Sequence, residues 1–142
     1  MSSVFIKVVR RKPSLMPRHN SQLAGRVILV VQRTWAIAHA LSSSLEANGA
    51  EVLLSVDPQS ASELVDHPDL SAAILDGSSG EVCQQLSARG IPYLLYTGRL
   101  QIDDACATAP VVLKPVSPTH VVERIERLLT GLNGHPASIK GP

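Results

Sequence analysis

The sequence predicts an α/β domain built on a doubly wound, five-stranded parallel sheet with helices on both faces. Strand-like and helix-like patterns alternate five times along the chain, with short connections between them. The strand-like segments are unbroken aliphatic runs, which is typical of parallel strands buried on both faces. The 142 residues fit one domain with tails, and 44% of them are hydrophobic, so the chain can form a sizeable core.

The predicted elements follow from local signals. Five aliphatic runs are expected as strands, at residues 26–31, 51–56, 72–76, 91–97 and 111–113. Thr34, Asp57 and Ser117 are suitable N-caps for the helices that follow them, and Pro58 and Pro118 suit a first helical turn. Residues 98–109 are poorly patterned. At this size, right-handed crossovers favour the flavodoxin-like strand order 2-1-3-4-5 in three α/β/α layers.

Charge and composition limit the classes of protein to which the chain can belong. Residues 1–24 are expected to be a flexible basic arm, residues 25–130 the folded domain, and residues 131–142 a tail. The first 25 residues carry five basic side chains and no acid, whereas the rest carries a net negative charge. This profile does not favour a nucleic-acid partner. No run reaches the roughly 18 apolar residues of a membrane helix, so we expect no membrane association and a cytoplasmic location; a transit peptide is the alternative for the basic N-terminus.

The two cysteines carry little information by themselves. Cys83 and Cys106 are far apart in the sequence and have no further Cys or His at metal-ligand spacing. A reduced pair of the kind found in cytosolic proteins is therefore the expectation.

Three side chains are predicted to meet at one edge of the sheet. Asp76, Thr97 and Lys114 end the third, fourth and fifth predicted strands, and the functional crevice of such folds lies outside the carboxyl ends of the strands. A carboxylate there can act as a nucleophile toward a phosphoryl group. A hydroxyl and an ammonium beside it can bind the phosphoryl oxygens.

The motifs around these residues carry a family resemblance. They are Ala-Ile-Leu-Asp at 73–76, Leu-Leu-Tyr-Thr-Gly at 94–98 and Val-Leu-Lys-Pro at 112–115. From about residue 25 to 129 the chain resembles the receiver domain of the response regulators of bacterial two-component systems. The resemblance implies that Asp76 is the phosphoacceptor position, Thr97 the switch hydroxyl and Lys114 the phosphate-pairing lysine. It also suggests a cis bond between Lys114 and Pro115, since X-Pro is the linkage in which cis is readily reached.

The chain departs from the family where the metal should bind. Receivers place two acidic residues after the first strand, and these hold Mg²⁺ together with the phosphoacceptor. Here the two positions are Gln32 and Arg33. Mg²⁺ prefers hard oxygen ligands that include carboxylates, and at ~4 Å with an effective dielectric near ~20 two like unit charges repel by roughly 4 kcal/mol. We expect Arg33 to pair with Asp76 and Mg²⁺ binding to be weak or absent; any metal would fall to Asp76 and Ser78.

The output side of the domain also departs from the family. The third helix and the segment between Thr97 and Lys114 are shorter than the family norm, so shortened third and fourth helices are expected. Val111 stands where many receivers carry an aromatic switch residue.

The sequence therefore favours an atypical receiver with impaired Mg²⁺-dependent phosphorylation that acts by protein–protein interaction and is not an enzyme. Its expected partner is a histidine kinase or another two-component protein, with a homodimer also open. The alternative is a conventional stand-alone response regulator phosphorylated at Asp76. A small phosphatase or hydrolase using Asp76, or a flavin- or nucleotide-binding protein of this fold, lacks the additional residues that such chemistry needs.

Overall fold

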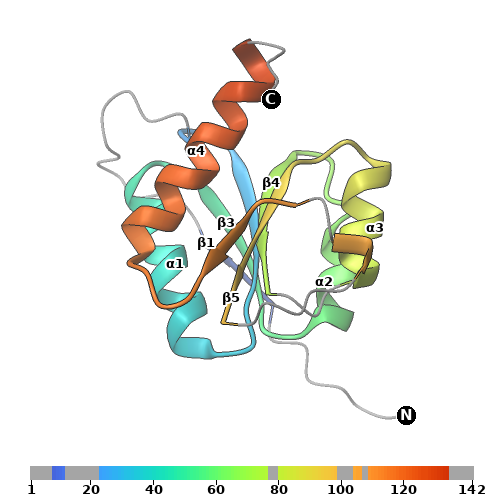
Figure 1. The fold of residues 1–142 in the computed structure, drawn as a ribbon, viewed down its shortest axis with the longest axis horizontal. Helices are drawn as coiled ribbons and strands as arrows, with labels where there is room; N and C mark the ends of the chain where they lie inside the picture. The colour runs from blue at the N-terminus through green and yellow to red at the C-terminus, as the bar shows by residue number, and fades with distance from the viewer. Residues whose placement is uncertain (1–7, 12–22, 77–79, 99–103, 107–108, 135–142) are drawn as a thin grey trace.

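The computed structural model describes residues 8–11, 23–76, 80–98, 104–106 and 109–134. They form one sheet between two helical layers (Figure 1). The five parallel strands are β2 (Val27–Val31), β3 (Glu51–Ser55), β4 (Leu70–Leu75), β5 (Tyr93–Thr97) and β6 (Val111–Leu113). They lie in the spatial order β3-β2-β4-β5-β6, which is the predicted order 2-1-3-4-5.

The helices divide between the two faces of the sheet. Helices α1 (Trp35–Ala47) and α4 (Pro118–Gly134) cover one face, and α2 (Pro58–Leu64), α3 (Gly80–Ala88) and the 3₁₀ helix η1 (Asp104–Cys106) lie on the other (Figure 1). Alternate residues of each central strand belong to different cores: Ile28 and Val30 pack with α1 and α4, whereas Leu29 packs with the opposite layer. This burial on both faces explains the unbroken aliphatic runs.

The shortened helices are confirmed. Helix α3 ends at Ala88, and the only helix among the described residues between β5 and β6 is the three-residue η1. Helix α4 continues to Gly134, beyond the predicted domain end at residue 130. No helix among the described residues is both long and apolar enough to cross a membrane.

The expectation of a flexible arm over residues 1–24 is wrong at residues 8–11 and at Leu23. Strand β1 (Val8–Arg11) pairs antiparallel with β3, with Val9 opposite Leu54. Leu23 is fully buried, so the packed domain begins before residue 25. The physical reason is that β3 would otherwise end the sheet with unpaired backbone groups, which another strand readily covers. Residues 1–7 and 12–22 of the arm lie outside the described residues.

The expectation of two separate reduced cysteines is also wrong. Cys83 and Cys106 form a disulfide, with their Cα atoms 5.5 Å apart and a sequence separation of 23. Helix α3 and η1 pack against each other on the same face of the sheet. Sequence separation alone could not reveal this proximity.

Two truncations test the role of β1. Removing residues 1–11 deletes the strand, whereas removing residues 1–7 leaves it in place. The longer truncation should lower the free energy of unfolding by roughly 1–3 kcal/mol, because each lost backbone hydrogen bond contributes about 0.5–1.5 kcal/mol net. The shorter one should have little effect. Urea denaturation measures both, and equal stability of the two truncated chains would contradict the pairing of β1 with β3.

Candidate functional site at the carboxyl edge of the sheet

Backbone hydrogen bonds join the ends of four parallel strands in two pairs, β2 with β4 and β5 with β6. Asp76 follows β4, and its amide donates to the carbonyl of Val31 at the end of β2 (3.0 Å). Lys114 follows β6, and its amide donates to the carbonyl of Thr97 at the end of β5 (2.8 Å). The bonds place the predicted residues along one edge of the sheet, as the resemblance implied. Ser78 lies outside the described residues.

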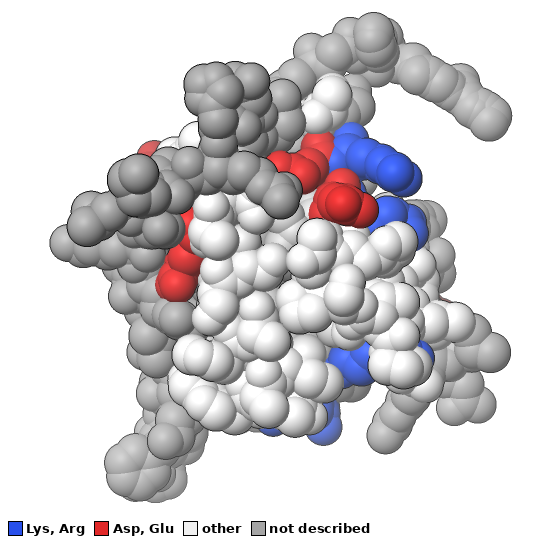
Figure 2. Space-filling view, turned by 90° about the vertical axis from the view of Figure 1, so that its left-hand side faces the viewer, with Lys and Arg blue, Asp and Glu red and all other residues white. Residues whose placement is uncertain are grey.

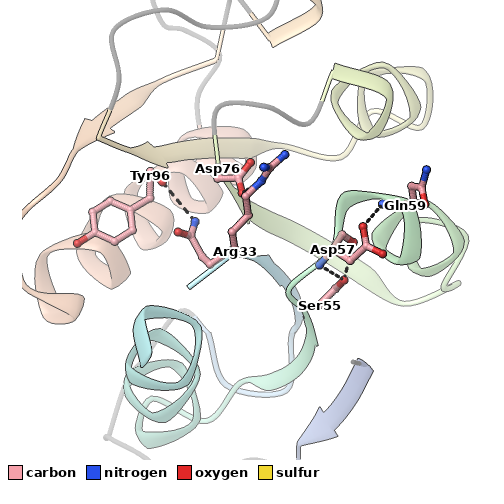
Figure 3. Close-up of polar contacts among 7 residues, drawn as sticks. Arg33, Ser55, Asp57, Gln59, Asp76 and Tyr96 are labelled. Atoms are coloured by element: carbon pink, nitrogen blue, oxygen red, sulfur yellow. Dashed lines mark hydrogen bonds and ion pairs between the residues drawn. The ribbon is translucent and has the colours of Figure 1, made fainter. Parts of the chain in front are cut away.

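Asp76 and Arg33 form the predicted ion pair. The Nε atom of Arg33 lies 3.5 Å from Oδ2 of Asp76, and Figure 3 shows the arginine side chain turned toward this carboxylate. The Asp76 side chain is 10% exposed and that of Arg33 is 63% exposed. A nearly buried carboxylate requires a charged or hydrogen-bonding partner, and Arg33 supplies positive charge from the solvent side.

Gln32, the other residue at the acidic-pair positions, faces inward. It is fully buried, and its Nε2 donates to the backbone carbonyl of Tyr96 at 3.3 Å (Figure 3). Its Oε1 is buried and has no hydrogen-bond partner among the described residues. The neutral amide therefore links the end of β2 to β5, which is not its neighbour in the sheet.

Lys114 brings a second positive charge to the edge. Burial lowers the pKa of its ammonium group, and the charge of Asp76 opposes this by raising it. The Nζ atom lies 5.3 Å from the centre of the Tyr96 ring, within the range of a cation–π contact. The predicted cis bond between Lys114 and Pro115 is present.

Tyr96 is the residue that the sequence analysis missed. Its hydroxyl donates to the carbonyl of Val116 (2.8 Å), while its ring lies under Lys114 and its own carbonyl accepts the bond from Gln32. Its neighbour Thr97 is buried at the end of β5. An aromatic ring with a polar tip at the penultimate position of a strand is a signal that could have found it.

Asp57, the nearest acid after β3, serves a structural purpose. It caps α2: its carboxylate accepts from the amide of Gln59 (3.0 Å) and from the hydroxyl of Ser60 (3.3 Å). This agrees with its predicted N-cap role, and Figure 3 shows it turned away from Asp76.

The described residues of the edge offer one carboxylate, that of Asp76, as a metal ligand. The described part of the chain contains no group of three or more His, Cys, Asp or Glu side chains placed to hold a metal. Beside Asp76 stand a guanidinium and an ammonium instead of further carboxylates. This donor set lacks the hard anionic oxygens that the ion prefers.

Comparisons with known proteins identify the fold. No family model matches the chain, and no curated protein matches it significantly. Among solved structures, a CheY-like response regulator receiver domain from Methanospirillum hungatei superposes with a TM-score of 0.68 at 22% identity, covering 76% of this chain and 96% of that one. The chemotaxis protein CheY4 of Vibrio cholerae gives 0.65 at 19%, covering 75% and 100%. A receiver domain from Clostridium thermocellum gives 0.66 at 18%, covering 76% and 97%.

The class of the protein is thus a doubly wound α/β domain with its candidate site at the carboxyl edge. Within that class, the chain has the fold of the receiver domains of response regulators.

The coupling between Asp76 and Lys114 can be measured directly. Replacing Asp76→Asn removes the carboxylate charge that raises the Lys114 pKa, so this pKa should fall further below its ordinary value. The matched control Asp57→Asn removes the carboxylate that caps α2 and should leave the Lys114 pKa in place. NMR titration of the lysine side chain measures both. An unchanged pKa in Asp76→Asn would contradict the coupling.

Proposed function

We propose that this chain is a receiver-type protein of two-component phosphorelay signalling, with impaired Mg²⁺-dependent phosphorylation, that acts by binding another protein. The observation that carries the proposal is the ion pair between Arg33 and Asp76. It puts a fixed positive charge beside the phosphoacceptor position, where the family holds a metal ion.

The charges at the edge argue against metal-assisted phosphorylation. Asp76 has two cations near it, Arg33 and Lys114. A divalent ion would have to approach both cations, and among the described residues the carboxylate of Asp76 is the group at this edge that would attract it. Phosphoryl transfer normally relies on such an ion to neutralise the developing charge. Asp76 should therefore accept a phosphoryl group poorly.

The surface next to the site suits protein binding. Helix α1 begins beside the edge and carries one charged residue, Glu46, over its whole length. Trp35 at its start is 49% exposed and stacks on His39, with the ring centres 6.4 Å apart. Figure 2 looks onto the side of the molecule that carries α1 and α4, where a broad area shows no Lys, Arg, Asp or Glu side chain. Exposed aromatic side chains on such areas are typical of interfaces.

The proposed partner is a histidine kinase or another two-component protein, and a second copy of the chain is the further candidate. A cytoplasmic location belongs to this proposal, and so does the absence of an enzymatic activity of its own. Turnover of a generic phosphate ester by the wild type but not by Asp76→Ala would instead indicate a hydrolase.

One observation favours the conventional alternative, a response regulator phosphorylated at Asp76. The Arg33 side chain is 63% exposed, and exposed ion pairs are held weakly. A kinase that displaces this side chain would uncover the carboxylate.

Restoring the acidic pair separates the two functions. The double variant Gln32→Asp, Arg33→Asp should bind Mg²⁺ at millimolar concentrations, which the fluorescence of Trp35 reports, and should gain the mass of one phosphoryl group with acetyl phosphate. The wild type should do neither under the same conditions. The matched control adds Asp76→Asn to the double variant and should abolish the mass gain. Efficient Mg²⁺-dependent labelling of wild-type Asp76 would overturn the proposal in favour of the conventional regulator.

A further inference from the structure

The disulfide between Cys83 and Cys106 joins two elements on the face opposite α1 and α4. Cys83 lies on the buried side of α3 with Val82 and Leu86, and Cys106 ends η1. Both cysteines are fully buried in the hydrophobic core between the sheet and the layer of α2, α3 and η1. Their Cα separation of 5.5 Å lies in the middle of the range that a disulfide spans. The chain has only these two cysteines, so no other pairing competes.

Cys106 is the main anchor of the connection between β5 and β6. Among the described residues of this connection, which are 98, 104–106, 109 and 110, Cys106 alone is buried. Ala105 and Ala109 pack partly against the same core, but their small side chains remove little apolar surface from water. The bond to α3 therefore supplies much of what holds this connection against the domain.

The connection also leads directly to the candidate site. It begins after Thr97 and ends at β6, whose next residue is Lys114. On β6, Leu113 is 44% exposed, so this edge offers an apolar contact point to another molecule. The disulfide therefore acts on a connection that starts after Thr97 and leads through β6 to Lys114, and both residues lie at the carboxyl edge.

We propose that Cys83 and Cys106 are a reversible thiol–disulfide site that reacts with low-molecular-weight disulfides of the glutathione class, and that its oxidation state sets how firmly η1 (residues 104–106) is held against α3. The oxidation state of this cysteine pair in the cell depends on the cytoplasmic location proposed above, where glutathione keeps thiols reduced. Disulfides found in that compartment are mostly transient or redox-sensing. The disulfide of the structure is then the oxidised form of this pair, and the dithiol is the form that such a compartment favours.

The reaction proceeds by two exchanges. Opening of η1, a helix of three residues, exposes Cys106 while α3 stays in place, because short elements open locally at low free energy. The Cys106 thiolate attacks oxidised glutathione, which forms a mixed disulfide and releases one reduced glutathione. The Cys83 thiolate then attacks the Cys106 sulfur and releases the second. The protein loses two electrons and two protons: the electrons reduce the glutathione disulfide, and the protons go to solvent or to the released glutathione thiolates.

The test uses the full chain in buffers of varied reduced-to-oxidised glutathione ratio. Thiol counting after acid quenching should show a reversible change from two free thiols to none. Hydrogen exchange at amides 104–114 should be faster in the reduced form by about tenfold or more, while the amides of β2 and β4 exchange equally in both forms. Cys106→Ala and Cys83→Ala should each exchange like the reduced wild type at every ratio.

Two results would overturn the proposal. One is a disulfide that stays intact in the folded protein under a large excess of reduced glutathione. The other is equal exchange at amides 104–114 in the two forms of the wild type, a comparison that needs no variant to fold. No phosphoryl donor or partner protein enters the experiment, so its outcome is independent of the role of Asp76.

Discussion

The register of the parallel strands is the constraint on which the site depends. Side chains alternate between the two faces of each strand, so a slip of one residue would exchange the two cores and turn every side chain at the strand ends around. Burial on both faces prevents such a slip: Val30 and Ile74 pack under α1 and α4, and Leu29 and Leu75 pack on the other side. The amide of Asp76 is bonded to the carbonyl of Val31 because that register is kept. The chemistry of the edge is thus determined by aliphatic residues that take no part in it.

Within this edge, the pair between Arg33 and Asp76 matters for its charge more than for its stability. A side chain that is 63% exposed contributes little to folding through an ion pair. Its electrostatic consequence is larger, because it neutralises a nearly buried carboxylate that would otherwise attract a cation. Lys114 acts in the same direction, and burial opposes the charged form of its own ammonium group. The edge therefore supplies the countercharge of Asp76 from its own side chains.

Local sequence patterns allowed much of the fold and of the candidate site to be predicted. The features that were missed depend on contacts between residues far apart in the sequence. The strands, the cap at Asp57 and the cis bond after Lys114 all follow from residues adjacent in sequence. The pairing of Arg33 with Asp76 was predictable because strand ends in this fold meet at one edge. Strand β1 was missed because four residues show no clear period, and its partner β3 is identified as an edge only once the sheet order is known. The disulfide depends on a contact between distant segments that no local pattern reports. A local signal marks Tyr96 at the end of its strand, but its contact with Lys114 depends on the tertiary fold.

The chain departs from the pattern that the sequence resemblance implied at residues 32–33 and in the connection between β5 and β6. The first departure places an amide and a guanidinium, Gln32 and Arg33, where that resemblance leads us to expect carboxylates. The second leaves, among the described residues, a three-residue helix where a longer one would bury an apolar face. So short a helix buries too little surface to hold its position by packing alone, and the bond between Cys83 and Cys106 supplies a covalent tie at that point. The carboxylate of Asp76 thus has a countercharge from Arg33, and the connection between β5 and β6 is tied to α3 by a covalent bond. Both features support the proposal that the domain acts by presenting a surface to a partner.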